Sequence, residues 1–567
     1  FAQSGSERIQ LNQVGFYPQA KKVAVVTGNT TATSFYIVRT EIKDTVYKGT
    51  LGAEKQSLNS ATVTRLADFS KVQQAGSFQL IVPEVGQSYV FQIGKHMLRP
   101  VALAALKGFY FMRSDQPLDA AFAGKWSRAA GHPDTTVFIH ESAADAKRST
   151  GTKIKSAGGW YDAGDYNKYI VNSGITMGTL LSAYEDFKPY FDTLHCAIPE
   201  SGNKVPDILD ETLYNLRWML TMQDSNDGGV YHKCTNAAFD GMVMPGVTQL
   251  PRYAVQKSTA AALDFAAVCA QASRVFSQYK NVFPGLADSC KNASEKAWQW
   301  ALQHPSVIYD QETLNKRFDP DISTGAYGDR NVSDEWLWAA AELFITTKSK
   351  QYFDTISNHL QDSVRLPSWS DVALLSHYSL LRYRTHLPAY AQPVMGLLKS
   401  RVLRLADVYI DKISSNAFAT VMGGSPKDFV WGSSAVAAYQ GVLLLNAYQL
   451  TRYKKYLDAA LTNLDYLLGR NATGYCFLTG SGSKSPMHPH HRPSVADGVV
   501  EPVPGLLSGG PNPGQQDHCV YLFSEPETSF SDTDCSYASN EIAINWNAPM
   551  VYLAHAIEAL SGTFTTK

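Results

Sequence analysis

Two aspartates lie three residues apart in the segment GGWYDAGDYNKYIV, residues 158–171. Glycines surround Asp162 and Asp165 and loosen the backbone, so we expect a loop that can pass close to a ligand. Two carboxylates beside several aromatic rings could hold a water molecule next to a flat, hydroxylated ligand. An Asx-turn, a helix cap or a calcium loop would use the same residue types, and this segment alone leaves those alternatives open.

A third carboxylate, Glu541, lies in the segment FSDTDCSYASNEIAINWNA, directly before an apolar helical pattern that begins near Ile542. It could simply cap that helix, because acidic side chains are favoured at a helix N-terminus. Alternatively, partial burial beside Tyr537 and Trp546 would raise the pKa of Glu541. A raised pKa suits a general acid.

Hydrolysis of a glycosidic bond accounts for the three carboxylates together. The reaction needs one carboxylic acid to protonate the leaving oxygen and one carboxylate to activate water or attack carbon. Asp165 and Asp162 would hold and deprotonate a water, and Glu541 would supply the proton. If the reaction inverts the anomeric carbon, the base and acid carboxyls should lie roughly 6.5–9.5 Å apart.

The segment SPMHPHHRPS, residues 485–494, crowds histidines and an arginine between prolines. Histidine and arginine are good hydrogen-bond donors for sugar hydroxyls or an anion. Metal binding by His488, His490 and His491 is a rival interpretation, although no acidic residue or cysteine lies close to them in the segment.

Composition excludes some classes of function. The 567 residues are 44% apolar and 18% charged, and the net charge of −1 favours neither nucleic acid nor an anionic membrane as a partner. No apolar run approaches the ~18 residues of a membrane-spanning helix. The chain starts at Phe1 without a signal peptide, as a mature secreted protein or a trimmed one would, so we expect a secreted or periplasmic location. Seven cysteines without a CxxC pair argue against a zinc cluster, leave at least one free thiol and allow one or two disulfides.

The elements that must position these residues fall into two parts. Residues 1 to about 98 contain short segments rich in β-branched and aromatic residues, which predict a structural β-sandwich of about seven strands. From about residue 100 the period becomes helical, with about twelve stretches, many of them alanine-rich and apolar on more than one side. A large closed array of helices with function on its loops is the simplest architecture. Residues 479–513 form an unusually long glycine- and proline-rich loop, which is expected to be functional or mobile.

The three motifs together resemble those of glycoside hydrolase family nine, the cellulase family. YDAGDYNKY looks like its catalytic-base motif, and GSKSPMHPHHR and FSDTDCSYASNEIAINWNA are similar to its other signatures. The resemblance implies a mainly α fold, an (α/α)6 barrel over residues 99–567, preceded by an immunoglobulin-like β-sandwich over residues 1–98. The start RIQLNQVGFYP is similar to that module.

The resemblance also implies roles for individual residues. Asp165 would be the base, Asp162 its partner on the water, and Glu541 the acid of an inverting mechanism. The implied substrate contacts are His490 and Arg492 on hydroxyls, Tyr537 beside the sugar, Trp431 stacked on a sugar, and Asp532 in support of the site.

The activity so implied is that of a secreted bacterial endo-β-1,4-glucanase that acts on cellulose or mixed-linkage β-glucan. Such an enzyme would need no catalytic cofactor and would be a monomer without nucleic-acid or membrane partners. An exo-acting β-glucosidase or β-glucosaminidase of the same family is the closest alternative. A sugar-binding protein without activity, or a lyase on a similar barrel, leaves the three carboxylates unexplained.

Metal sites are the last expectation. Family members often bind structural calcium, and Gly325, Asp329, Asp334 and Glu335 offer oxygen ligands. Ser333 could instead cap the following helix, with the acidic pair in its first turn. Some relatives hold a structural zinc ahead of the DAGD motif. The corresponding region here keeps two histidines, at positions 132 and 140, but no cysteine, which speaks against zinc.

Overall fold

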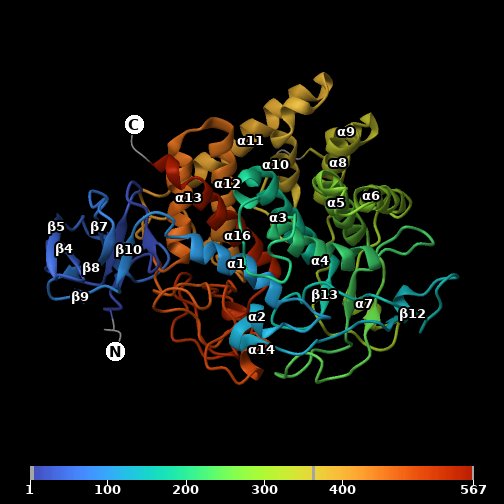
Figure 1. Cartoon of the computed structure of the whole chain (residues 1–567), viewed down its shortest axis with the longest axis horizontal. Coiled ribbons are helices and arrows are strands. Elements are labelled where there is room, and N and C mark those ends of the chain that lie inside the picture. Colours follow the sequence, from blue (N-terminus) through green and yellow to red (C-terminus); the bar gives the residue numbers. More distant parts are fainter. Residues whose placement is uncertain (1–4, 361–363, 565–567) are drawn as a thin grey trace. The chain divides into compact units, whose positions relative to one another are not determined.

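A computed structural model describes residues 5–360 and 364–564. The chain divides into two compact units. The first contains segments Phe1–Gly108, Leu403–His490 and Val500–Lys567, and the second contains Phe109–Val402 and His491–Val499. Figure 1 shows the helices and strands along the chain.

The N-terminal part of the first unit is a β-sandwich of two sheets. One sheet has the order β1-β3-β7-β6, and the other has the order β2-β10-β8-β4-β5 with β9 beside β8. The sequence predicted about seven strands, and the structure has more because four of its strands contain only two residues. The strands are β1 Ile9–Gln10, β2 Gly15–Phe16, β3 Val23–Thr27, β4 Ser34–Arg39, β5 Asp44–Thr50, β6 Lys55–Gln56, β7 Val63–Asp68, β8 Gly76–Val82, β9 Gly86–Gln87 and β10 Phe91–Ile93.

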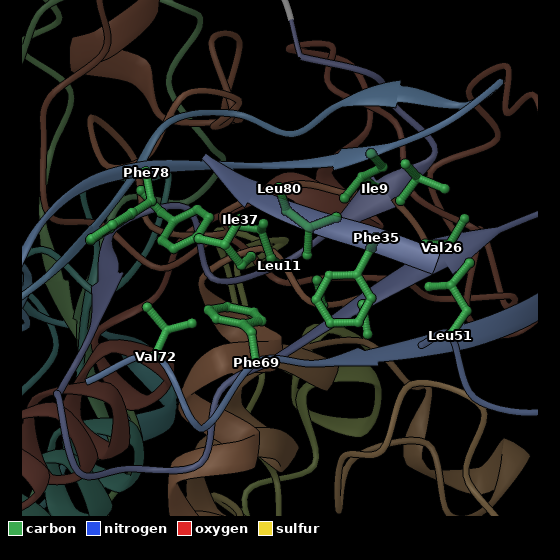
Figure 2. Packing of buried hydrophobic residues seen from close by; sticks show 14 of the residues in the cluster. Ile9, Leu11, Val26, Phe35, Ile37, Leu51, Phe69, Val72, Phe78 and Leu80 are labelled. Atoms are coloured by element: carbon green, nitrogen blue, oxygen red, sulfur yellow. The ribbon is translucent and has the colours of Figure 1, made fainter. Parts of the chain in front are cut away.

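Alternation along the strands builds the core of this sandwich. Successive side chains of a strand point to opposite faces, so Phe35 and Ile37 of β4 meet Phe78 and Leu80 of β8 inside. Figure 2 shows these residues with Ile9, Leu11, Val26, Leu51, Phe69 and Val72 in one apolar cluster.

Helices α12 (Ser433–Thr451), α13 (Lys454–Leu467) and α16 (Ile544–Ala559) belong to the same unit and pack on one another. The sandwich contacts this group through polar side chains. Asn12 donates to Asp465 of α13 at 2.9 Å, and Tyr17 donates to Glu558 of α16 at 2.5 Å. The sandwich is therefore bonded to the helices that carry the C-terminal motifs.

The second unit is built from helices that pack in neighbouring pairs. Helix α3 packs on α4 and α5, α5 packs on α6 and α8, and α8 packs on α9 and α10. Alanine-rich α5 and α8 are buried on nearly every side, as their sequences predicted. The bounds are α3 Ile170–Phe191, α4 Asp207–Thr221, α5 Thr259–Phe276, α6 Leu286–Gln303, α8 Ser333–Thr347, α9 Lys350–His359 and α10 Ala373–Arg382.

Smaller elements complete the description. A sheet of order β12-β11-β15-β14-β13 lies beside these helices in the second unit. Its strands are β11 Val137–Ile139, β12 Lys153–Ile154, β13 Lys168–Tyr169, β14 Lys233–Thr235 and β15 Tyr253–Ala254. The remaining helices are α1 Arg99–Phe111, α2 Ala120–Ala123, α7 Gln311–Asn315, α11 Gln392–Ile410, α14 Arg492–Ala496 and α15 Tyr537–Asn540. In residues 5–360 and 364–564 we find no helix with the length and apolar character needed to span a membrane.

Candidate active site

The DAGD loop, residues 158–167, is anchored at its start by side chains of helix α4 in the second unit. Gly159 has a φ of 85°, and a Cβ there would lie 2.7 Å from the ring of Trp218, so the position requires glycine. The buried Trp160 donates its backbone N–H to Asn215 at 3.1 Å and its indole N–H to Glu211 at 3.3 Å. These contacts fix the part of the loop that precedes the two aspartates in the sequence. The loop then continues into β13 and α3.

Asp162 is buried, and both of its carboxylate oxygens accept hydrogen bonds. Oδ1 accepts from Asn172 Nδ2 at 2.6 Å, and Oδ2 accepts from the Tyr327 hydroxyl at 2.7 Å. Burial, together with the charge of Asp165, raises the pKa of Asp162 to about 8. At neutral pH Asp162 therefore holds a proton far more readily than an ordinary aspartate.

Asp165 has a different environment. Its Oδ2 accepts from the backbone N–H of Asn167 at 3.2 Å, from Asn167 Nδ2 at 2.5 Å and from the Tyr169 hydroxyl at 3.3 Å. No hydrogen bond from a described residue reaches its Oδ1. The two aspartates thus differ, because one oxygen of Asp165 stays available to a water molecule.

Arg492 of the second unit is buried against the DAGD loop. Its backbone N–H and its Nη1 donate to the carbonyl of Gly164 at 3.2 and 2.7 Å, and its Nε donates to the carbonyl of Asp240 at 2.9 Å. Most of the guanidinium is therefore committed to holding the loop. The expected contact between Arg492 and a sugar hydroxyl stays a prediction. Nη2 is the guanidinium nitrogen that could make it.

A buried ion network supports the next residues of the same loop. Asp134 accepts from Lys168 Nζ at 2.7 Å and from Arg252 Nε at 3.0 Å. These two cations hold the pKa of Asp134 well below its usual range, against the opposing effect of burial. Arg252 also donates to the carbonyl of Tyr166 at 3.0 Å. The network fixes the backbone that follows Asp165.

Glu541 lies in the first unit, in the short connection between α15 and α16. Its backbone pairs with that of His490, and its carbonyl accepts from the N–H of Gly509 at 2.8 Å. Helix α16 begins at Ile544 with Ala543 at the N-cap and no side-chain cap. Glu541 is therefore not the N-cap residue of α16, and its side chain is half-buried.

Three predicted sugar contacts form a row of rings in the first unit. The ring centroids of Trp431 and Tyr537 are 5.5 Å apart, and those of His490 and Tyr537 are also 5.5 Å apart. Trp431 is 42% exposed, so its indole face is accessible. Such a face suits stacking on the apolar face of a sugar ring.

Asp532 holds the histidine-rich segment by its backbone. Its two oxygens accept from the N–H groups of Met487 at 2.8 Å and His488 at 3.0 Å. Asn540 donates to the carbonyl of His488 at 2.7 Å. These bonds fit the supporting role expected of Asp532.

The predicted calcium ligands adjoin a carboxylate that the sequence did not single out, Asp264 of α5. Both oxygens of Asp264 and of Glu335, and Oδ2 of Asp329, are buried without a hydrogen-bond partner among the described residues. Burial, reinforced by mutual repulsion, raises the pKa of Asp264 and Glu335 well above the usual range, and burial raises that of Asp334 to about 6. Unpaired buried carboxylates are ligands that calcium prefers, so the chemistry of the set suits this ion, although the oxygens are not gathered within 4.8 Å of one another.

Gly325 and Ser333, which belong to the same predicted segment, differ from these carboxylates in their contacts. The carbonyl of Gly325 accepts a hydrogen bond from Lys233 Nζ at 2.7 Å. Ser333 is the first residue of α8, while Val332 occupies the N-cap position and makes no side-chain cap bond. Helix capping by Ser333 is therefore wrong as an explanation of this segment.

One further acidic group, Asp145, Asp224 and Asp227, has the spacing of a metal site. The ammonium of Lys257 lies among these carboxylates, at 3.4, 2.8 and 2.8 Å, and Arg148 contacts Asp224 at 3.3 Å. Two side-chain cations thus already pair with the three carboxylates of this group. Among the described residues no other group of three such ligand atoms lies within 4.8 Å of one another, so neither the histidines of residues 488–491 nor the carboxylates around Asp264 are gathered that closely.

Zinc does not fit the region ahead of the DAGD motif. His132 Nδ1 lies 2.8 Å from the hydroxyl of Tyr161, and a Cβ at Gly131 would fall 2.0 Å from that hydroxyl. His140 uses Nδ1 on Ser142 at 2.9 Å and Nε2 on a backbone carbonyl at 2.9 Å. The two histidines therefore have separate partners, and a tyrosine oxygen fills the space beside His132.

Cys519 and Cys535 form a disulfide in the first unit. The bond lies two residues before Tyr537 and six before Glu541 in the sequence. The other five cysteines are free and buried, which agrees with the expectation of one or two disulfides.

Four side chains at the aspartate pair were not predicted from the sequence: Asn167, Asn172, Tyr327 and Arg252. Asn167 and Asn172 follow the motif closely, and an asparagine in a buried first helical turn is a detectable signal. Tyr327 and Arg252 lie far away in sequence, and only the fold brings Tyr327 to Asp162 and Arg252 to Asn167.

The chain is similar to known proteins along nearly its whole length. A family model described as glycosyl hydrolase family 9 matches residues 100–554, and one described as a cellulase N-terminal ig-like domain matches residues 4–87. The chain is 45% identical over 558 residues to a xyloglucan-specific endo-beta-1,4-glucanase of Bacteroides ovatus, covering 98% of this chain and 94% of that one.

Two further relatives are similar over nearly the whole chain. Endoglucanase D of Acetivibrio thermocellus is 33% identical over 551 residues, covering 96% of this chain and 82% of that one. A solved structure described as Bacteroides ovatus GH9 superposes with a TM-score of 0.94 at 44% identity, covering 98% of this chain and 100% of that one. These matches confirm the predicted (α/α)6-barrel fold with an immunoglobulin-like N-terminal module, and the predicted class of endo-acting glycoside hydrolase.

Proposed function

Because the chain belongs to glycosyl hydrolase family 9, we propose that it cleaves internal β-1,4-glucosidic bonds of a β-glucan with inversion, Asp165 acting as base and Glu541 as acid. The observation that carries these roles is the contrast within the aspartate pair. Asp162 has both oxygens occupied and a raised pKa, whereas Asp165 keeps one oxygen for water.

The reaction follows from these assignments. Asp165 Oδ1 takes a proton from a water molecule as the water oxygen bonds to the anomeric carbon. The electron pair of the breaking glycosidic bond goes to the leaving oxygen, which receives the proton of Glu541. Asp162 lies beside the same water and helps to hold it. Because burial and the charge of Asp165 raise the pKa of Asp162 to about 8, Asp162 is suited to hold the water.

The substrate is a β-1,4-linked glucan chain. The row formed by Trp431, Tyr537 and His490 supplies a stacking face and polar edges for successive sugars. Two relatives over nearly the full chain are endoglucanases, and one of them is xyloglucan-specific, so xyloglucan is the first polymer to test.

A structural calcium ion completes the proposal. Asp264, Asp329, Asp334 and Glu335 would hold it, because both oxygens of Asp264 and of Glu335 and Oδ2 of Asp329 are buried without a hydrogen-bond partner among the described residues. The ion would neutralise the group and stabilise the start of α8, and it would take no part in the chemistry. The chain is further proposed to be a secreted or periplasmic monomer, with its sandwich at residues 1–98 and its barrel at 99–567.

The product profile tests this function. Xyloglucan, carboxymethyl-cellulose and cello-oligosaccharides are incubated with the enzyme, and viscosity and released sugars are measured. Endo action predicts rapid loss of viscosity with few reducing ends. Release of monosaccharide alone, with viscosity unchanged, would replace the proposal by the exo-acting alternative.

A further inference from the structure

Asn167 lies two residues after the proposed base, and its carboxamide is held on both sides. Its Oδ1 accepts from Thr235 Oγ1 at 3.0 Å, from the backbone N–H of Asn236 at 2.9 Å and from Arg252 Nη1 at 3.3 Å. Its Nδ2 donates to Asp165 Oδ2 at 2.5 Å. The amide therefore connects a set of three donors to the carboxylate.

Only one orientation of this amide is compatible with its surroundings. Rotation by half a turn would place Nδ2 against two groups that can only donate, the N–H of Asn236 and Nη1 of Arg252, and Oδ1 against a carboxylate. Asn167 is 2% exposed, so water could not replace the lost bonds. Arg252 is itself fixed by Asp134 and by the carbonyl of Tyr166, so the orientation originates in the buried ion network.

The carboxylate of Asp165 is oriented as a consequence. Three donors converge on Oδ2, two from Asn167 and one from the Tyr169 hydroxyl, and none from the described residues reaches Oδ1. Hydrogen bonds stabilise negative charge on the oxygen that accepts them. The oxygen without donors is therefore the one that accepts a new proton most readily.

We propose that Asn167, oriented by Arg252, and Tyr169 are positioning residues that reserve Oδ1 of Asp165 as the atom that takes the proton from the attacking water. This inference rests on the proposed function of Asp165. In the step, one O–H bond of water breaks, its proton bonds to Oδ1, and its electron pair becomes available for the new bond to the anomeric carbon.

Charged and titratable groups also surround Asp165. Burial lowers the pKa of Lys233 well below its usual range against the opposing charge of Asp165, and burial with the charge of Asp165 raises the pKa of Asp162. The three protons of the Lys233 ammonium have acceptors in Gln311, Thr324 and Gly325, so this cation acts through space. Among the described residues, Asp162, Tyr169, Lys233 and Asp240 interact electrostatically with Asp165, and Arg252 is linked to it through Asn167.

The test is the substitution Asn167→Asp, which keeps an acceptor for the three donors and replaces the donor to Asp165 by a carboxylate, so that Asp165 loses a hydrogen bond and gains a repulsive neighbour. We expect the acid limb of the kcat/KM profile on a soluble glucan to move to higher pH by about one unit or more. KM should change little, because Asn167 is buried. Asn315→Asp is the matched control, since Asn315 donates to and accepts from the backbone of Ile322 at 2.9 and 3.0 Å, away from the proposed site. Its profile should be unchanged.

Tyr169→Phe is the second variant, because it removes one hydroxyl and keeps the ring. It should shift the acid limb in the same direction by a smaller amount. If circular dichroism shows that Asn167→Asp is unfolded, Tyr169→Phe alone tests the positioning role. Unchanged acid limbs in the folded variants, with Asp165→Ala inactive, would refute the positioning role alone. Full activity of Asp165→Ala would instead refute the proposed base.

Discussion

Replacing Asp162 by asparagine should stabilise the protein, and the gain should grow with pH. A buried aspartate whose pKa is about 8 in the folded state and 3.8 as its ordinary value favours folding only when protonated. Its contribution is full below pH 3.8 and is lost as the pH rises through 8. Each pH unit between 3.8 and 8 lowers the free energy of unfolding by roughly 1.4 kcal/mol. The total loss is at most about 4 kcal/mol at pH 7 and about 2 kcal/mol at pH 5.

The asparagine keeps the local geometry. Its Oδ1 can still accept from Asn172, and the Tyr327 hydroxyl can turn to accept from the new amide. An unfolding entropy of about 2.1 cal/mol/K per residue over 567 residues converts these energies to a melting-temperature gain of about 3 °C at pH 7 and about 1 °C at pH 5.

Calorimetry of Asp162→Asn and the wild type at both pH values measures this difference. The control is Asp354→Asn, because that carboxylate is 56% exposed and pairs with Lys350 at the surface. Its effect should not grow with pH. A gain at position 162 that is equal at the two pH values, or a loss at pH 7, would refute the argument from burial and charge.

Four further predictions concern the chemistry and the supports of the site. Glu541→Gln should lose most turnover on glucans but much less on aryl glycosides with acidic leaving groups, and equal loss on both would exclude Glu541 as the acid. Asp165→Ala should lower turnover by roughly 10²–10⁴-fold, azide should restore part of it, and proton NMR of the wild-type product should show the α-anomer first; a β-anomer first would mean retention. Calcium should raise the melting temperature of EDTA-treated protein but not that of Glu335→Gln, and equal responses would place the ion elsewhere. Deleting residues 1–98 should lower the melting temperature because the bonds to Asp465 and Glu558 are lost, whereas a folded, inactive truncation would show a direct role in catalysis.

Much of the fold could be predicted because its signals are local. The 3.6-residue period of α5 and α8 and the alternation of β4 and β8 are present in short windows of sequence. The base loop was recognisable for the same reason, since both aspartates and their glycines lie within ten residues. The distance between the base and acid carboxyls stays a prediction.

The second layer of the site could not be predicted in this way. Tyr327 reaches Asp162 from 165 residues away, and Asp264 adjoins Glu335 although α5 and α8 lie far apart in sequence. Arg492 was predicted to bind sugar, yet the fold turns most of its donors to the backbone of the DAGD loop. Such pairings depend on how helices pack, which a single sequence does not specify.

The disulfide between Cys519 and Cys535 has a practical consequence for how the enzyme is produced. It closes a loop with a sequence separation of 16 residues, and closing a loop of that size contributes about 3 kcal/mol in the chain-entropy model. Protein made in a reducing cytosol lacks this restraint just before Tyr537 and Glu541, whereas the segment around Asp165 contains no cysteine and has no such restraint to lose. Preparations from different hosts would then differ in the order of the acid-bearing segment while sharing the same base, so specific activities are comparable only at equal thiol content.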